Sequence, residues 1–358
     1  MIEAGPCARS LQIDYDDEVE FHAQRWLFDQ ARKKDRQPFF LTVSFTSPHD
    51  PYVAQRKFWD IYRTEDIDLP EVGPIPADER DAHSARIHEH YSIGKAEVTN
   101  EILLRARHGY YASISYIDRK VENLMRTLQE AGLDRNTIVV FASDHGDMMG
   151  ERGLFYKKSF FEWSVRVPLI FWAPNLFGPA RMSAPVSLLD ILPTFHDFAG
   201  GPPDEVLDAD GASLLPVLNG ADSRDRIVPG EFLAEGVFEP TFMLRDDRYK
   251  LFYSEIDPPL LFDMVEDPHE LDNLAEDPRH ARKLEQFCSH GSDLSNASDI
   301  RKTIIADQNR RRLIDRAHKM GKPPVWDYQP IVDASQSWVR AGKWTVEVEA
   351  GAHFDMTD

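Results

Sequence analysis

Three short apolar runs, each followed by polar residues, set the strongest limit on how this chain can fold. They cover residues 39–45, 137–142 and 167–172 and consist mainly of branched and aromatic side chains. Runs of this length and composition are typical of parallel strands that are covered on both faces. We therefore expect an α/β fold built on a doubly wound sheet, with helices on its two faces.

Helices are predicted around these strands, over residues 14–34, about 100–131 and about 187–198. In the second of them, apolar residues recur at steps of three and four positions. Gly132, followed by Leu133, predicts its C-terminal cap, and Ser187 with Asp190 has the spacing of a capping box at the start of the third helix. Residues 53–98 are polar and contain prolines, so they are interpreted as an irregular insertion over the site.

The pattern changes after about residue 225, where short apolar segments alternate with turn residues. This alternation predicts a smaller antiparallel sheet, and the charged stretch that follows it predicts helices over 278–320. We expect an α/β domain over 1–224, an antiparallel α+β subdomain over 225–300 and a C-terminal extension over 301–358. The expected strands are 231–234, 241–245, 249–253 and 260–264, with Asp246 and Asp247 in the turn of a hairpin.

Charge and cysteine content exclude several classes of function. The chain has 41 Lys and Arg against 61 Asp and Glu, a net charge of −20, which argues against binding to nucleic acid or to an anionic membrane. No apolar stretch is long enough to span a bilayer, and the first residues do not have the build of a signal peptide. Cys7 and Cys288 are the only cysteines, so we expect no disulfide framework and a cytoplasmic location.

Titratable side chains follow two of the predicted strands. His49 comes after the first strand, and Asp144 and His145 come after the second. Ligands of open parallel sheets lie beyond the carboxyl ends of the strands, so these side chains are candidates for one site. A carboxylate beside an imidazole, with Gly146 letting the backbone turn, suits a divalent cation. The alternative is a plain strand-end turn in which Asp144 caps backbone N–H groups.

Two further candidates carry positive charge or a titratable proton. His49 lies between two prolines and could donate a proton to a leaving oxygen, or it could be bonded to a loop carbonyl. Lys157 could neutralise the oxygens of a sulfate or phosphate ester, or it could belong with Lys158 to a solvated lysine pair. Arg166 is interpreted as a structural partner of Glu162.

Two tempting features are given structural explanations instead. Cys7 lacks an identifiable base, so it is interpreted as a free structural cysteine. Asp16 and Asp17 resemble a metal-binding pair, but they lie in the first turn of a predicted helix, where capping interactions explain them.

Taken together, the motifs resemble those of the sulfatases of the alkaline phosphatase superfamily, over nearly the whole chain. They are SFTSPHDPY at 44–52, SDHGD at 143–147, Lys157, and FEWSVRVP at 161–168. The segment LFDMVEDPHELDNL at 261–274 is similar to the family's C-terminal turn. WDYQPIVDAS at 326–335 is similar to the terminal extension of choline sulfatases, which implies hydrolysis of choline-O-sulfate to choline and sulfate.

The resemblance also implies roles for single residues. Asp144 and His145 would hold a divalent cation, Ca²⁺ or Mn²⁺. Lys157 would contact the sulfate oxygens, and His49 would assist the departing choline oxygen. Glu235 would face the trimethylammonium group, since a carboxylate with aromatic neighbours suits a quaternary cation; the alternative is a surface charge.

The chain also departs from the family pattern. The family's nucleophile is a formylglycine made within a C/S-x-P-x-R motif, and an Asp-Asp metal pair precedes it; neither occurs in these 358 residues. We therefore expect a choline sulfatase without its N-terminal portion, inactive and prone to aggregation by itself. The alternatives are a phosphonate or phosphate ester hydrolase of the same superfamily, and a non-catalytic fragment or partner subunit. The C-terminal extension is a possible site of homo-oligomerisation.

Overall fold

The computed structural model describes residues 3–94, 98–202, 209–221, 226–234, 236–294 and 297–321. These residues belong to two compact units. The first comprises residues 1–71, 96–138 and 312–358, and the second comprises 72–95 and 139–311. Each unit is described by itself below. In the part of the chain that the structure describes, no helix has both the length and the apolarity needed to cross a membrane.

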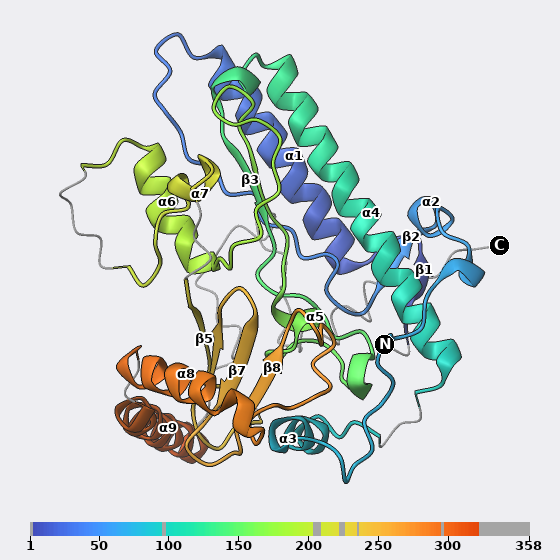
Figure 1. The fold of residues 1–358 in the computed structure, drawn as a ribbon. Helices are drawn as coiled ribbons and strands as arrows, with labels where there is room; N and C mark the ends of the chain where they lie inside the picture. Colours follow the sequence, from blue (N-terminus) through green and yellow to red (C-terminus); the bar gives the residue numbers. More distant parts are fainter. Residues whose placement is uncertain are drawn as a thin grey trace. The chain divides into compact units, whose positions relative to one another are not determined.

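Two long helices lie side by side in the first unit, α1 (Leu11–Arg32) and α4 (Asn100–Glu130) (Figure 1). The Ser10 hydroxyl accepts from the Ile13 N–H and caps α1. The predicted end of α4 is confirmed: Gly132 has φ 63°, and the Leu133 N–H donates to the Leu128 carbonyl. The unit also contains the parallel pair β1 (Gly5–Cys7) and β2 (Val53–Gln55), and the short helix α2 (Arg56–Trp59).

The second unit contains an antiparallel sheet in the order β5-β6-β7-β8. Its strands interdigitate apolar side chains in two buried clusters, one around Phe252 and Phe262 and one around Leu251 and Phe287. Helix α8 packs on β6 and β7 through Phe287. The predicted antiparallel sheet after residue 225 is thereby confirmed, hairpin included. The elements are β5 (Val228–Phe232), β6 (Thr241–Arg245), β7 (Tyr249–Tyr253), β8 (Leu260–Asp263) and α8 (Ala281–Leu294). Helix α9 (Ala297–Met320) belongs to this unit as far as residue 311.

The second unit also contains a second sheet, the antiparallel pair of β3 and β4. The predicted capping box is present: the Ser187 hydroxyl accepts from the backbone of the first turn, and the Asp190 carboxylate accepts from the Ser187 N–H. The bounds are α3 (Ala82–His90), β3 (Val139–Ala142), α5 (Glu162–Val165), β4 (Leu169–Trp172), α6 (Ile191–Phe198) and α7 (Leu215–Leu218).

Three expectations about the sheets and loops were wrong. Residues 39–45 are extended but pair with no strand among the described residues, and their exposure alternates, with Phe40 71% exposed. The β3–β4 pair is antiparallel and only partly buried. The sequence did not predict this, because an apolar run shows neither the direction of the neighbouring strand nor which elements cover the sheet. Residues 53–98 are not wholly irregular, since they contain β2, α2 and α3.

Candidate functional site

Asp144 and His145 follow β3 directly, and their side chains lie together. The His145 Nε2 is 3.5 Å from the Asp144 Oδ2, and the other carboxylate oxygen accepts from the His145 N–H at 2.9 Å. The Asp144 side chain is 84% exposed. Asp144 therefore caps a backbone N–H group, as the alternative from the sequence analysis predicts. Only one of its carboxylate oxygens does so, and the second faces the imidazole of His145.

The ring of His145 is oriented by a neighbouring carbonyl. Its Nδ1 lies 2.8 Å from the Gly146 carbonyl oxygen. A carbonyl can only accept, so Nδ1 carries the proton and Nε2 carries the lone pair, the arrangement in which histidines hold metals. An imidazole nitrogen and a carboxylate oxygen fit a divalent cation as two of its ligands. The described residues contain no group of three or more His, Cys, Asp and Glu placed to bind a metal.

Gly146 is required for close packing. The Gly146 N–H donates to the Ser164 carbonyl at 2.7 Å, and a Cβ at this position would lie 2.1 Å from the Trp163 carbonyl oxygen. Its φ is not in the left-handed region, so the need for glycine here comes from this close approach and not from a left-handed backbone. The glycine instead lets the segment after β3 touch the backbone of α5.

Lys157 belongs to the same loop as the Asp144–His145 pair. The Met148 N–H donates to the Tyr156 carbonyl at 2.6 Å, which folds the loop back on itself. Lys158 has φ 84°, and its carbonyl lies 2.9 Å from the Nε2 of the buried His83. The lysines are thus part of a structured loop, and both side chains are half-buried. The interpretation as a solvated pair does not describe them.

A buried ion cluster behind this loop had no distinct signal in the sequence. The Lys250 ammonium on β7 lies 2.7 Å from a carboxylate oxygen of Glu162 and 2.7 Å from one of Glu270. Burial alone would raise the pKa of Glu162, but Lys250 outweighs that effect and leaves the pKa lowered. Burial raises the pKa of Glu270. Lys250 is thus the ion-pair partner of Glu162, and the expected pairing with Arg166 was wrong.

His49 lies in the loop after residues 39–45. Its backbone N–H donates to the Thr46 carbonyl at 3.2 Å, and its Nδ1 is 2.8 Å from a carboxylate oxygen of Asp50 and 3.2 Å from the Asp50 carbonyl. Both the carbonyl contact and a charged partner are therefore present. Because Nδ1 faces the acceptors of Asp50, it carries a proton, and the ring can give an Nε2 proton to a substrate only when both nitrogens are protonated.

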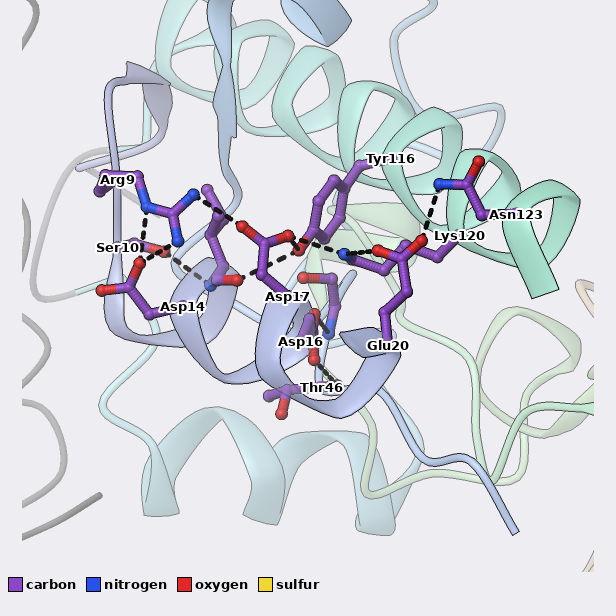
Figure 2. A network of polar contacts seen from close by, with 12 residues as sticks. Arg9, Ser10, Asp14, Asp16, Asp17, Glu20, Thr46, Tyr116, Lys120 and Asn123 are labelled. Atoms are coloured by element: carbon purple, nitrogen blue, oxygen red, sulfur yellow. Dashed lines mark hydrogen bonds and ion pairs between the residues drawn. The ribbon is translucent and has the colours of Figure 1, made fainter. Parts of the chain in front are cut away.

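Asp16 and Asp17 have functions that the sequence did not show (Figure 2). Asp16 is fully buried and accepts from the backbone N–H groups of Thr46 and Ser47, at 2.7 and 3.1 Å. Asp17 faces α4, where its carboxylate accepts from Lys120 at 2.7 Å. Their interpretation as first-turn capping groups was wrong: both lie inside α1 and reach to other segments.

The structure thus gathers some of the expected site residues. Asp144, His145 and Lys157 share a loop in the second unit, while His49 lies in the first. Glu235 and the WDYQPIVDAS segment lie outside the described residues. Cys7 is buried in β1 and is not part of a disulfide. Asp16 and Lys250 were missed, because only their contacts with residues far along the chain distinguish them from surface charges.

Three family models match the chain. The Sulfatase model matches residues 5–201, and the model of the N-sulphoglucosamine sulphohydrolase C-terminal region matches 150–295. The model of the choline sulfatase C terminus matches 302–354. The matches run from near one end of the chain to near the other, in agreement with the motifs.

Proteins of known activity are similar over much of the chain. A choline-sulfatase of Rhizobium meliloti is 41% identical over 94% of this chain and 67% of its own length. An arylsulfatase of Clostridium perfringens is 31% identical over 71% of this chain and 53% of its own length. The chain thus spans between half and about two thirds of these relatives.

Solved structures share the fold. A phosphonate monoester hydrolase of Agrobacterium radiobacter has a TM-score of 0.64 and 25% identity, covering 82% of this chain and 64% of its own. The protein yidJ of Bacteroides fragilis, described as a putative sulfatase, has a TM-score of 0.61 and 27% identity, over 76% of this chain and 56% of its own. The alkaline-phosphatase-like fold class is confirmed. On these matches, the chain belongs to the sulfatase family.

Proposed function

We propose that this chain carries the cation-binding and sulfate-binding part of a site that hydrolyses choline-O-sulfate. The observation that carries the proposal is the 41% identity to a choline-sulfatase over 94% of the chain. The match of residues 302–354 to the choline sulfatase C terminus supports the same substrate. We keep the division into a catalytic domain (1–224), a sheet subdomain (225–300) and an extension (301–358) as part of the proposal.

In this proposal, each candidate residue has one task. Asp144 and His145 hold a divalent cation, Ca²⁺ or Mn²⁺, which when bound withdraws electron density from the ester oxygens. Lys157 binds the sulfate oxygens and neutralises the negative charge that grows as the S–O bond breaks. His49, with both ring nitrogens protonated, gives its Nε2 proton to the choline oxygen. Choline then leaves with a neutral hydroxyl group instead of an alkoxide.

The nucleophilic step is not assigned to any residue. The sulfatase family uses a formylglycine made in a C/S-x-P-x-R motif, and the 358 residues contain no such motif. A polypeptide of these residues alone is therefore expected to release choline no faster than its His49→Ala/Lys157→Ala variant. Choline release clearly above that control would contradict this expectation.

The test of the proposal is a comparison of the two adjacent lysines. Isothermal titration calorimetry with choline-O-sulfate, in the presence of Ca²⁺ or Mn²⁺, should show binding that Lys157→Ala weakens about tenfold or more, the value of one lost charged contact. Lys158→Ala is the matched control and should bind as the parent does. Equal loss in both variants, or no binding by the parent protein, would contradict the proposal.

A phosphonate ester substrate is the second candidate, favoured by the likeness to the phosphonate monoester hydrolase of Agrobacterium radiobacter. The same calorimetric cell can be titrated with a phosphonate monoester. The proposal predicts tighter binding of choline-O-sulfate, while a preference for the phosphonate would reverse the assignment.

The choline end of the ligand is proposed to face Glu235. Glu235→Gln should weaken binding of choline-O-sulfate without weakening that of inorganic sulfate, since only the trimethylammonium group faces the carboxylate. Glu231→Gln, an exposed position on β5, serves as the control. Equal effects on both ligands would assign Glu235 a structural role.

Two further parts of the proposal concern the state of the protein. The C-terminal extension is proposed to join copies of the chain, which sedimentation equilibrium of the full chain tests directly. A reducing, cytoplasmic location is proposed because Cys7 and Cys288, the two cysteines of the chain, form no disulfide with each other.

A further inference from the structure

A buried carboxylate on α1, that of Asp16, binds the backbone of the loop that carries His49. Asp16 is 0% exposed, and its two carboxylate oxygens accept separately from the Thr46 and Ser47 N–H groups, at 2.7 and 3.1 Å (Figure 2). These donors lie three and two residues before His49. Asp16 itself lies some thirty residues earlier in the chain, so the contact fixes tertiary structure and not a local turn.

A buried carboxylate is costly unless hydrogen bonds and charges offset its lost hydration. At Asp16, burial raises the pKa of the carboxyl group, and the hydrogen bonds from Thr46 and Ser47 and the charge of Lys120 offset only part of this effect. Such charge-assisted hydrogen bonds are about twice as strong as neutral ones. Each of the two carboxylate oxygens accepts one backbone N–H of the loop, an arrangement that Asn, with one acceptor oxygen, and Ala, with none, cannot reproduce.

Other contacts hold the far end of the same loop. The Gln12 side-chain amide donates to the Asp50 carbonyl at 2.6 Å. Gly109 on α4 approaches Tyr52 so closely that a Cβ there would lie 2.0 Å from the Tyr52 carbonyl oxygen. The loop is thus held from α1 on both sides of His49 and from α4 beyond it, which fixes where the imidazole leaves the backbone.

We propose that Asp16 is a positioning residue that fixes the His49 imidazole by binding the Thr46 and Ser47 N–H groups. The role of His49 in catalysis rests on the proposed function, but the positioning itself does not. Both claims can therefore be tested in one protein with separate readouts.

The test compares Asp16→Asn and Asp16→Ala with the parent chain. Asn keeps the shape and one acceptor, whereas Ala keeps neither, so their effects should be graded. Amide hydrogen exchange at Thr46 and Ser47 should become about tenfold faster or more in Asp16→Asn, and faster still in Asp16→Ala. The Cε1–H resonance of His49 should shift or broaden in the same order, a change that a general loss of stability would not confine to this ring.

Asp14→Asn is the matched control. Asp14 lies on the same helix, but its carboxylate binds Arg9 at 2.6 Å, so the His49 resonance should stay unchanged. If the Asp16 variants do not fold, Gln12→Leu provides a second test, because it removes only the hydrogen bond to Asp50 and should shift the His49 resonance by itself.

The outcomes separate the two claims. If Thr46, Ser47 and His49 respond to Asp16→Asn while neither the variant nor the parent binds choline-O-sulfate, the positioning role stands and the proposed function fails. If exchange and the His49 resonance are the same in Asp16→Asn as in the parent, the positioning role is contradicted, whatever the ligand binding shows.

Discussion

The Lys250 ammonium lies 2.7 Å from a carboxylate oxygen of Glu270, and both side chains are completely buried. Glu162, which opens α5, forms the third member of this cluster, and its backbone N–H donates to the other carboxylate oxygen of Glu270 at 2.8 Å. Because Gly146 binds the backbone of α5, the cluster connects the antiparallel sheet to the loop of Asp144 and His145. The antiparallel sheet is therefore linked through Glu270 and α5 to the loop that carries the candidate cation ligands.

Removing the central charge of this cluster should be strongly destabilising. Lys250→Met leaves the buried Glu270 and the half-buried Glu162 without their cation and should lower the free energy of unfolding by about 3–5 kcal/mol. Urea denaturation followed by circular dichroism measures the change. Lys302→Met, which removes an exposed pair with Asp299 on α9, should change it by less than about 1 kcal/mol. Similar values for the two variants would contradict the importance of the buried cluster.

The Arg86–Asp257 pair predicts how stability depends on acid. Arg86 donates to both oxygens of Asp257, one of them at 2.9 Å. Burial alone would raise the pKa of Asp257, but the hydrogen bond and charge of Arg86 outweigh it and leave the pKa lowered. A carboxyl with a lowered pKa in the folded state stabilises the fold above its unfolded pKa, and this contribution is lost as the pH falls through the folded value.

Asp257→Asn should therefore be less stable than the parent near pH 6, and the difference should shrink as the pH falls below about 4. Denaturation curves of both proteins at a series of pH values provide the comparison. A difference that stays constant from pH 6 to pH 3 would show that the charge of Asp257 contributes nothing.

Gly146 should tolerate no side chain. Gly146→Ala places a Cβ 2.1 Å from the Trp163 carbonyl oxygen, and a backbone oxygen cannot move aside as a flexible side chain can. We expect a loss of about 1–3 kcal/mol in the free energy of unfolding, the usual range for overpacking, together with weaker cation binding. Gly178→Ala meets no atom within 4 Å and is the control. Unchanged stability in Gly146→Ala would mean that the loop can shift away from α5.

The sequence predicts the elements of this fold better than their pairing. The cap at Gly132, the capping box at Ser187 and the β6–β7 hairpin depend on residues close together in the chain, and all three are confirmed. The direction of β3 against β4 depends on the whole topology. Apolar runs at 39–45 and 137–142 carry no information about it, and both expectations failed.

The candidate site shows the same division. Asp144 and His145 are adjacent in the chain, so their proximity follows from the sequence. The carbonyl that orients His145 belongs to Gly146, the residue that follows it. Asp16 contacts residues 46 and 47, and Lys250 contacts residues 162 and 270. Contacts across such separations leave no pattern in one sequence, so the sequence predicts only a helix-capping role for Asp16 and no particular role for Lys250.

The most direct measurement of the central claim is cation binding by Asp144 and His145. Titration of the full chain with Mn²⁺, followed by calorimetry and by paramagnetic broadening of the His145 ring resonances, should show one site. Asp144→Asn should weaken that site about tenfold or more, the usual cost of disturbing a metal ligand. Asp134→Asn, in the turn before β3, should leave it unchanged. Binding that is equal in the parent and in Asp144→Asn, or broadening that spares His145, would contradict the account.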